Sequence, residues 1–389
     1  MTDVAILVAS VFLLIAFALE RLDQTSGLPS VVIMIAVGMT AKPALHSLGI
    51  PGQGLEAVVP VAGIVGLVLI VLEGALDIEL HREQMRLAAT AFLFAAGALI
   101  FYGAVFATLA LHILKLSVLH AVILATPFAL ISSAIAIPGS RSLPARARQF
   151  IVYESSASDI LGVLVFFALI NSRATLAGFL TALAGGGLLS LLLAAACSVV
   201  LVLISTRATA QIRFVPLLAG LFALYSAGEL LHLSPLIMVV LFGLMLNNRA
   251  ALARIPPLAG LAGRISGETV EEFKVLVREL TFAVRGFFFF LLGYSTDLAG
   301  FGRPLAWAAA AAILLVVFLT RFGALRLLDR RLAGTVTWVA PRGLITVLLY
   351  LDARRLIPGP RYLDEIVLLV VLGSTGLLAL ARRRRAVSA

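Results

Sequence analysis

The sequence has few charged and few polar residues compared with a soluble protein. Only 13% of its 389 residues are charged, while 61% are hydrophobic, and this balance excludes an ordinary soluble domain of this length. Its one cysteine, Cys197, lies inside an apolar run, so a disulfide framework is excluded and thiol redox chemistry is not expected. The composition predicts an all-α polytopic membrane protein.

Acidic residues are also scarce relative to basic ones, and the formal net charge is +10. The arginines lie mainly in the connections between apolar runs, so we expect them to orient the helices and expect no nucleic-acid partner. Most of them lie on the membrane side opposite the N-terminus, including the tail at 382–385. This bias predicts an external N-terminus and a cytoplasmic C-terminus. We expect the membrane to be the inner membrane of a prokaryotic cell.

Apolar runs bounded by charged residues, glycine and proline predict about thirteen membrane helices. The predicted helices are 4–22, 28–42, 58–78, 87–113, 118–137, 149–171, 175–204, 213–232, 234–247, 269–297, 304–327, 333–354 and 362–381.

Two sequence pairings indicate that the halves of the chain repeat. The second helix at 28–39 resembles the ninth at 233–245, and the end of the third at 72–78 resembles the end of the tenth at 292–298. Both pairings are offset by seven helices. Because an odd offset reverses the direction of corresponding helices, the pattern predicts two inverted-topology repeats, which are typical of secondary transporters.

The same offset pairs the fifth helix with the twelfth, and both carry helix-breaking residues. The fifth contains Pro127, Ser132, Ser133 and Pro138, and the twelfth contains proline, arginine and glycine at 341–343. Proline removes a backbone donor and clashes with the preceding turn. Interrupted helices at corresponding positions predict a transport site near the middle of the membrane.

The sixth helix carries a polar face inside an apolar run. Ser155 and Asp159 are i, i+4 neighbours, Ser155 and Ser158 are i, i+3 neighbours, and Gly162 follows one turn later. Intramembrane carboxylates are expensive and usually functional. Burial favours the protonated carboxyl group, whereas a bound cation favours the ionised form. We therefore predict that a proton and a monovalent cation compete for Asp159, with Ser155 and Ser158 as oxygen ligands.

Other charges in apolar spans need partners or roles. Glu154 lies about 140° from Asp159 around the helix, and we expect it to form a structural ion pair with Arg342. Arg285 is expected either to screen the site or to lie at a helix end with its charge in water. Glu73 is a candidate ligand or access residue, or an interfacial carboxylate. Ser132 is expected to contribute oxygens if the fifth helix unwinds, or to cap the broken helix.

These motifs resemble the monovalent cation:proton antiporters, and most nearly the NhaP-type sodium/proton exchangers. The resemblance rests on 132–137, on Glu154-Ser155 with Ser158-Asp159, on 285–293 and on Pro341 to Leu344. It implies an elevator-like antiporter in which the fifth and twelfth helices are unwound and cross. It also implies ion binding by Asp159, Ser155 and Glu73 and a bridge between Glu154 and Arg342.

The resemblance further implies a homodimer surrounded by lipid. Its core helices would span about 58–171 and 269–381, and its scaffold and dimerisation helices about 1–57 and 175–250, with no soluble regulatory domain. The family has asparagine or aspartate where this chain has Ser158, and Thr-Asp-Pro where it has 132–134, which leaves Na⁺, K⁺ and Li⁺ open as the cation.

We expect electroneutral exchange of one such cation for one proton, without a cofactor. A channel-like, proton-coupled K⁺ efflux pathway is the alternative function. An intramembrane hydrolase is not expected, since neither His-Glu-x-x-His nor Gly-x-Ser-x-Gly occurs in the sequence.

Overall fold

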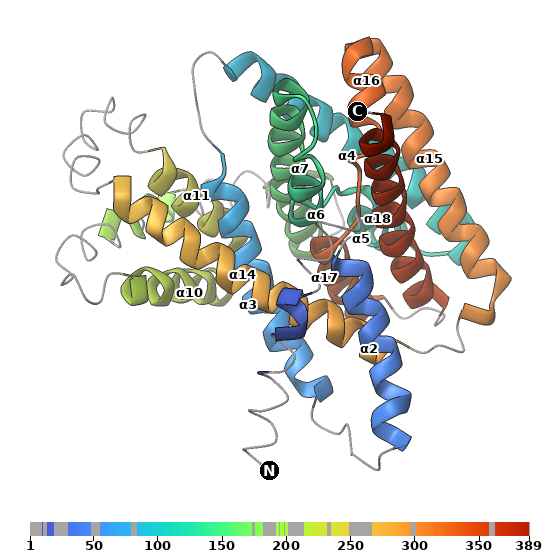
Figure 1. The fold of residues 1–389 in the computed structure, drawn as a ribbon, viewed down its shortest axis with the longest axis horizontal. Helices are drawn as coiled ribbons and strands as arrows, with labels where there is room; N and C mark the ends of the chain where they lie inside the picture. The colour runs from blue at the N-terminus through green and yellow to red at the C-terminus, as the bar shows by residue number, and fades with distance from the viewer. Residues whose placement is uncertain are drawn as a thin grey trace. The chain divides into compact units, whose positions relative to one another are not determined.

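The structure is a computed structural model of the chain, and helix is the regular secondary structure of its described residues. The described residues are 10, 14–18, 30–47, 55–78, 84–172, 176–181, scattered positions in 192–200, 214–231, 235–248, 267–296, 301–357 and 362–388. No β-strand occurs among them (Figure 1). The predicted all-α fold is therefore confirmed.

The helices are labelled in Figure 1 and have the following bounds. They are α2 (Ser30–Ser47), α3 (Leu55–Leu76), α4 (Met85–Leu114), α5 (Val118–Ala129), α6 (Ser133–Gly139), α7 (Ala145–Asn171), α8 (Leu176–Thr181), α10 (Phe214–Leu230), α11 (Pro235–Asn247), α14 (Gly267–Ser295), α15 (Pro304–Leu328), α16 (Arg330–Val336), α17 (Leu344–Leu356) and α18 (Tyr362–Ser388).

These bounds agree with the predicted helices to within a few residues over most of the chain. The run predicted at 118–137 is divided into α5 and α6, and the run predicted at 333–354 is divided into α16 and α17. The runs predicted at 4–22 and 175–204 lie mostly outside the described residues, so the count of thirteen helices stays a prediction.

Five stretches within the described part of the chain are long and apolar enough to cross a bilayer. They are Met85–Leu114, Val118–Gly139, Ala145–Asn171, Pro304–Leu328 and Tyr362–Arg384. In α4 and α15 only 28% of the apolar window is buried, and large side chains such as Ile100 and Leu315 are exposed. Such faces suit contact with lipid tails.

The chain divides into two compact units. The first consists of Met1–Leu67, Ala134–Ile151 and Thr281–Ala389, and the second of Val68–Ser133 and Val152–Leu280. In the first unit α15 and α18 lie side by side (Figure 1). In the second unit α4 packs against α5, and α10 packs against α11.

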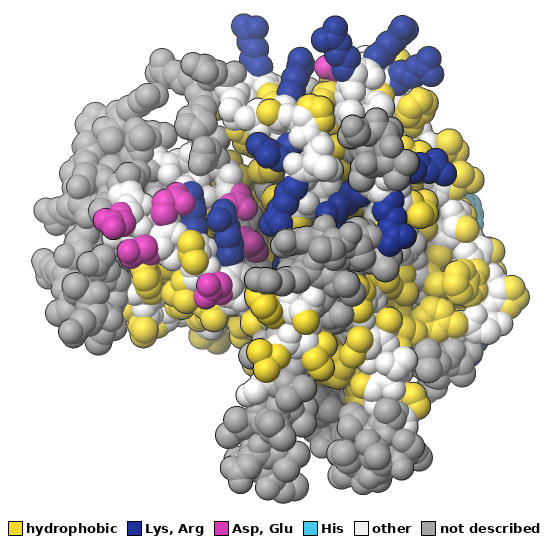
Figure 2. Space-filling model, viewed as in Figure 1, with side chains coloured by type: hydrophobic (Ala, Val, Ile, Leu, Met, Phe, Trp, Pro, Cys, Tyr) yellow, Lys and Arg dark blue, Asp and Glu magenta, His cyan; other side chains and the backbone are white. Residues whose placement is uncertain are grey.

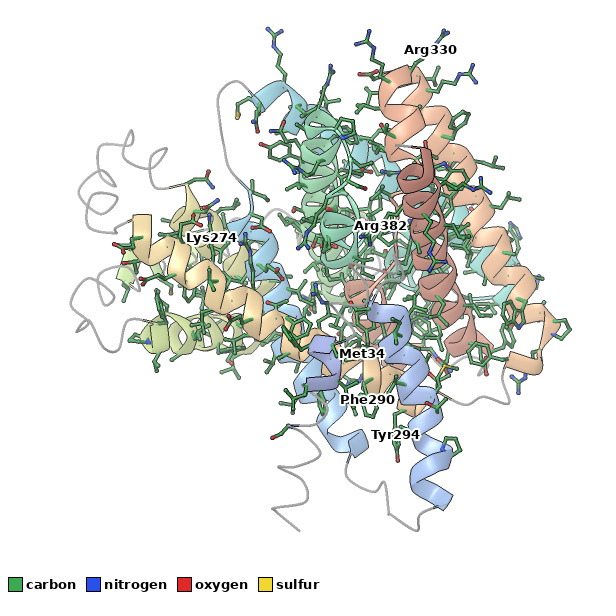
Figure 3. The ribbon with its side chains drawn as sticks, viewed as in Figure 1. Met34, Lys274, Phe290, Tyr294, Arg330 and Arg382 are labelled. Atoms are coloured by element: carbon green, nitrogen blue, oxygen red, sulfur yellow. The ribbon has the colours of Figure 1, made fainter. Side chains whose placement is uncertain are left out.

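Two glycines bring α2 and α14 into backbone contact in the first unit. A methyl group added at Gly38 would overlap the carbonyl oxygen of Phe290, and one added at Gly293 would overlap the carbonyl oxygen of Ile35. Met34, Phe290 and Tyr294, labelled in Figure 3, belong to the two helices that meet here. Only glycine allows two helix backbones to approach this closely.

The second unit contains a comparable contact between α11 and α3. A methyl group at Gly243 would lie 2.7 Å from the Cβ atom of Ala75 and 3.2 Å from Leu72 Cδ1. Just beyond it, the side-chain amides of Asn247 and Asn248 donate to the carbonyl oxygen of Ile78 at 2.9 and 2.8 Å. These bonds satisfy a carbonyl that α3 leaves without a helical partner at its end.

Basic side chains gather at the end of the first unit that carries α16. Figure 2 shows Lys and Arg side chains collected at the top of the view, where Figure 3 labels Arg330. Arg146, just inside α7, forms an ion pair with Asp329 at 3.3 Å. The residues predicted to face the cytoplasm thus include a group that shares one end of this unit.

Candidate functional site

The fifth predicted membrane helix is broken where the sequence predicts a break. Helix α5 ends at Ala129, Leu130 has extended backbone angles (φ −87°, ψ 148°), and α6 begins at Ser133. Pro127 removes the amide that would bond to the carbonyl of Ile123, which weakens the last turn of α5. Three residues, 130–132, therefore have backbone groups without helical partners inside a buried region.

Polar side chains of α7 accept hydrogen bonds from this broken segment. The backbone N–H of Ser133 donates to Asp159 Oδ2 at 3.1 Å. The backbone N–H of Ile131 donates to Ser158 Oγ at 3.0 Å. Because buried backbone donors must be paired, Asp159 and Ser158 also hold the break in place.

Several oxygens in this region are buried without a hydrogen-bond partner among the described residues. They are Asp159 Oδ1, Ser132 Oγ and Ser156 Oγ, on side chains of residues that are 5%, 1% and 3% exposed. Buried polar atoms in native structures normally have a partner, so an unpaired group points to a ligand or a function. Oxygens of this kind suit a hard monovalent cation or a proton.

Ser156 is a site candidate that the sequence analysis missed. It lies three residues before Asp159, on the same side of α7, and its hydroxyl is one of the unpaired oxygens. A methyl group at Gly74 would lie 3.9 Å from Ser156 Oγ and 3.7 Å from Ser133 Oγ. The backbone of α3 thus runs beside both serines, and the helical spacing from Asp159 could have identified Ser156.

The structure gives less direct support for Ser155 and Glu73 as ion ligands. Ser155 is buried, and its hydroxyl donates to the Val152 carbonyl within α7 at 3.5 Å. Glu73 is half-buried near the end of α3 and lies close enough to Arg278 to interact with its charge. Arg278 itself forms an ion pair with Asp77 at 2.8 Å. Ion binding by Ser155 and Glu73 stays a prediction.

The twelfth predicted membrane helix is broken in a similar way. Helix α16 ends at Val336 and α17 begins at Leu344, with Pro341 between them. The backbone N–H of Arg342 donates to Ser374 Oγ in α18 at 2.9 Å, and Arg342 Nη1 donates to the Ala340 carbonyl at 2.9 Å. Ser374 is a second residue that the sequence analysis missed.

Three charges predicted in apolar spans remain, and each of them is at least partly buried. Glu154 is 1% exposed and Arg342 is fully buried. They belong to different units, so their predicted pairing stays a prediction. Arg285 Nη1 donates to the carbonyl of Ala134 at 3.1 Å. The guanidinium is therefore bound to the backbone of α6 and does not extend from a helix end into water.

Comparison with known proteins places the chain in a family. Residues 6–381 match the family described as sodium/hydrogen exchanger, transmembrane. The fold is similar to the sodium proton antiporter MjNhaP1 from Methanocaldococcus jannaschii at pH 8, with a TM-score of 0.75 and 18% identity over 97% of each chain. An electron-microscopy structure of the same antiporter gives a TM-score of 0.69 and 18% identity over 99% of this chain and 96% of that chain.

No curated protein sequence matches the chain. The family match covers nearly all of it, and this family consists of transporters rather than enzymes. The chain therefore belongs to the transmembrane sodium/hydrogen exchanger family of cation/proton antiporters.

Proposed function

We propose that this protein exchanges Na⁺ for a proton at Asp159 by alternating access. The observation that carries the proposal is the half-satisfied carboxylate: Oδ2 accepts the backbone N–H of Ser133, while Oδ1 is buried without a partner in the described residues. A cation next to Oδ1 would stabilise the ionised form, and a proton on Oδ1 would remove the charge that burial disfavours. The two ligands then exclude one another.

The proposed cation ligands are oxygens from two elements. Asp159 Oδ1 and the hydroxyl of Ser156 come from α7, and the hydroxyl of Ser132 comes from the unwound segment before α6. Ser155 and Glu73 complete the proposed set through the resemblance to NhaP-type exchangers. One carboxylate matches the charge of one monovalent cation, and K⁺ or Li⁺ would compete for the same oxygens.

Two repeated contacts support the proposed inverted repeat. The broken segments donate a backbone N–H to a serine of the following membrane helix, Ser158 in one case and Ser374 in the other. In addition, Gly38 of α2 packs closely on α14, while Gly243 of α11 packs closely on α3. Both correspondences follow the offset of seven predicted helices, as an inverted repeat requires.

We also propose the wider organisation that the resemblance implies. The protein would form a homodimer, with core helices at about 58–171 and 269–381 and scaffold helices at about 1–57 and 175–250. The group of basic residues around α16 would face the cytoplasm, which places the N-terminus outside by the positive-inside rule.

The test is exchange in proteoliposomes after the substitution Asp159→Asn. The amide cannot carry a proton, so we expect cation-driven proton flux to fall to the level of empty liposomes. The matched control is Asp352→Asn, which removes a surface carboxylate paired with Arg355 and should leave exchange unchanged. Comparing sodium, potassium, lithium and choline gradients identifies the cation, and proton flux that persists in Asp159→Asn would refute the proposed role.

A further inference from the structure

Helix α6 contains a backbone defect that its own sequence creates. In an α-helix the carbonyl of residue i accepts the N–H of residue i+4. The residue four positions after Ala134 is Pro138, which lies inside α6 and has no N–H. The Ala134 carbonyl is thus left without its helical donor, in a helix that begins beside the ion site.

The guanidinium of Arg285 occupies the place of the missing donor. Arg285 Nη1 donates to the Ala134 carbonyl at 3.1 Å across 151 residues of sequence. Arg285 lies in α14, where it is only partly exposed, and a charged donor makes a stronger bond than a neutral amide. A charge inside an apolar stretch of α14 therefore has a backbone partner.

The carbonyl that Arg285 holds is adjacent to the group that binds the carboxylate. Ser133 precedes Ala134 directly, and its N–H donates to Asp159 Oδ2 at 3.1 Å. The two interactions are therefore made by consecutive residues, at the N–H of Ser133 and at the carbonyl of Ala134. A shift of the first turn of α6 would move the Ser133 N–H relative to the Asp159 carboxylate that accepts from it.

We propose that Arg285 is a positioning residue of the ion site, which replaces the amide that Pro138 lacks and so holds α6 where Ser133 meets Asp159. The inference rests on the proposed function of Asp159. It assigns Arg285 a role through the backbone of α6, in contrast to a direct effect of its charge on the cation.

The experiment tests whether a backbone N–H restored at position 138 compensates for loss of the Arg285 guanidinium. Arg285→Met removes the guanidinium and should raise the KM for the cation about tenfold or more, as expected for loss of one charge-assisted hydrogen bond. Pro138→Ala alone should leave the KM near the wild-type value. The double variant Arg285→Met with Pro138→Ala gives the Ala134 carbonyl an N–H four residues away, and its KM should return to within about threefold of wild type.

Arg285→Lys is a second variant at this position, and it tests the inference if Arg285→Met does not fold. Lysine keeps the charge and one donor but not the planar fork of arginine, so its KM should be intermediate and should also improve when combined with Pro138→Ala. If the charge of Arg285 acted directly on the cation, Pro138→Ala would give no improvement in either background. That result, or a wild-type KM in Arg285→Met, would overturn the inference.

Two further measurements separate this inference from its alternatives. A purely structural role would lower the melting temperature of Arg285→Met while the KM stays constant, and this outcome also counts against positioning. Asp159→Asn is measured in parallel. Exchange that persists in Asp159→Asn would overturn the proposed function, whereas its loss together with an absent rescue would overturn only the role of Arg285.

Discussion

Replacing Gly293 with alanine should loosen the crossing of α2 and α14. The added methyl group would overlap the carbonyl oxygen of Ile35 and would lie 2.9 Å from its carbonyl carbon and 3.0 Å from its Cα. All three atoms belong to the backbone, so no rotamer change can relieve the overlap. Overpacking of this kind lowers the free energy of unfolding by about 1–3 kcal/mol. Because the overlap is with backbone atoms, we expect the loss for Gly293→Ala to fall toward the upper end of this range.

The control is Gly97→Ala in α4, where a methyl group would have no neighbour within 4 Å. Alanine is a better helix former than glycine by about 1 kcal/mol, so this variant should be as stable as the wild type or slightly more stable. Gly293→Ala gains the same increase in helix propensity. A net loss of stability in this variant therefore measures the cost of the overlap between α2 and α14.

Thermal unfolding of both purified variants in one detergent measures the difference. We expect Gly293→Ala to melt below the wild type and Gly97→Ala to melt at or above it. A melting temperature for Gly293→Ala equal to that of Gly97→Ala would show that α2 and α14 do not approach through this glycine.

Three further predictions concern the site. Ser158→Ala should leave the Ile131 N–H without its acceptor and lower stability by about 1–3 kcal/mol. Ser158→Asn supplies an acceptor and should lower stability less. Equal melting temperatures for the two variants would argue against this bond. Glu154→Gln and Arg342→Ala should each reduce melting temperature, and a double-mutant cycle should show a coupling of about 0.5–3 kcal/mol, whereas simple additivity would exclude their pairing. If Asp159 carries a single proton per cation, an imposed potassium–valinomycin potential should leave sodium-driven proton flux unchanged; acceleration by voltage would indicate a second exchanged carboxylate.

The sequence alone determined the features that depend on neighbours along the chain. Apolar run lengths predicted most of the described helices, because a bilayer sets the length of a spanning helix. Helical spacing identified the polar face around Asp159, since residues three and four apart are neighbours whatever the fold. Pro127, Pro138 and Pro341 predicted both interruptions, because proline lacks the amide that an intact helix needs. The resemblance on the sixth-helix motif identified the family.

Only the tertiary structure decided which groups meet across the chain. The sequence placed Ser132 and Ser133 at the break, but it did not show that Ser133 donates its N–H to Asp159, 26 residues away. The structure likewise shows that Arg285, 151 residues later in the chain, donates to the Ala134 carbonyl, for which Pro138 has no N–H to offer. Local patterns constrain one helix at a time, whereas these partners depend on the packing between helices. For that reason the lack of a hydrogen-bond partner at Ser156 Oγ and Asp159 Oδ1 became visible only in the folded chain.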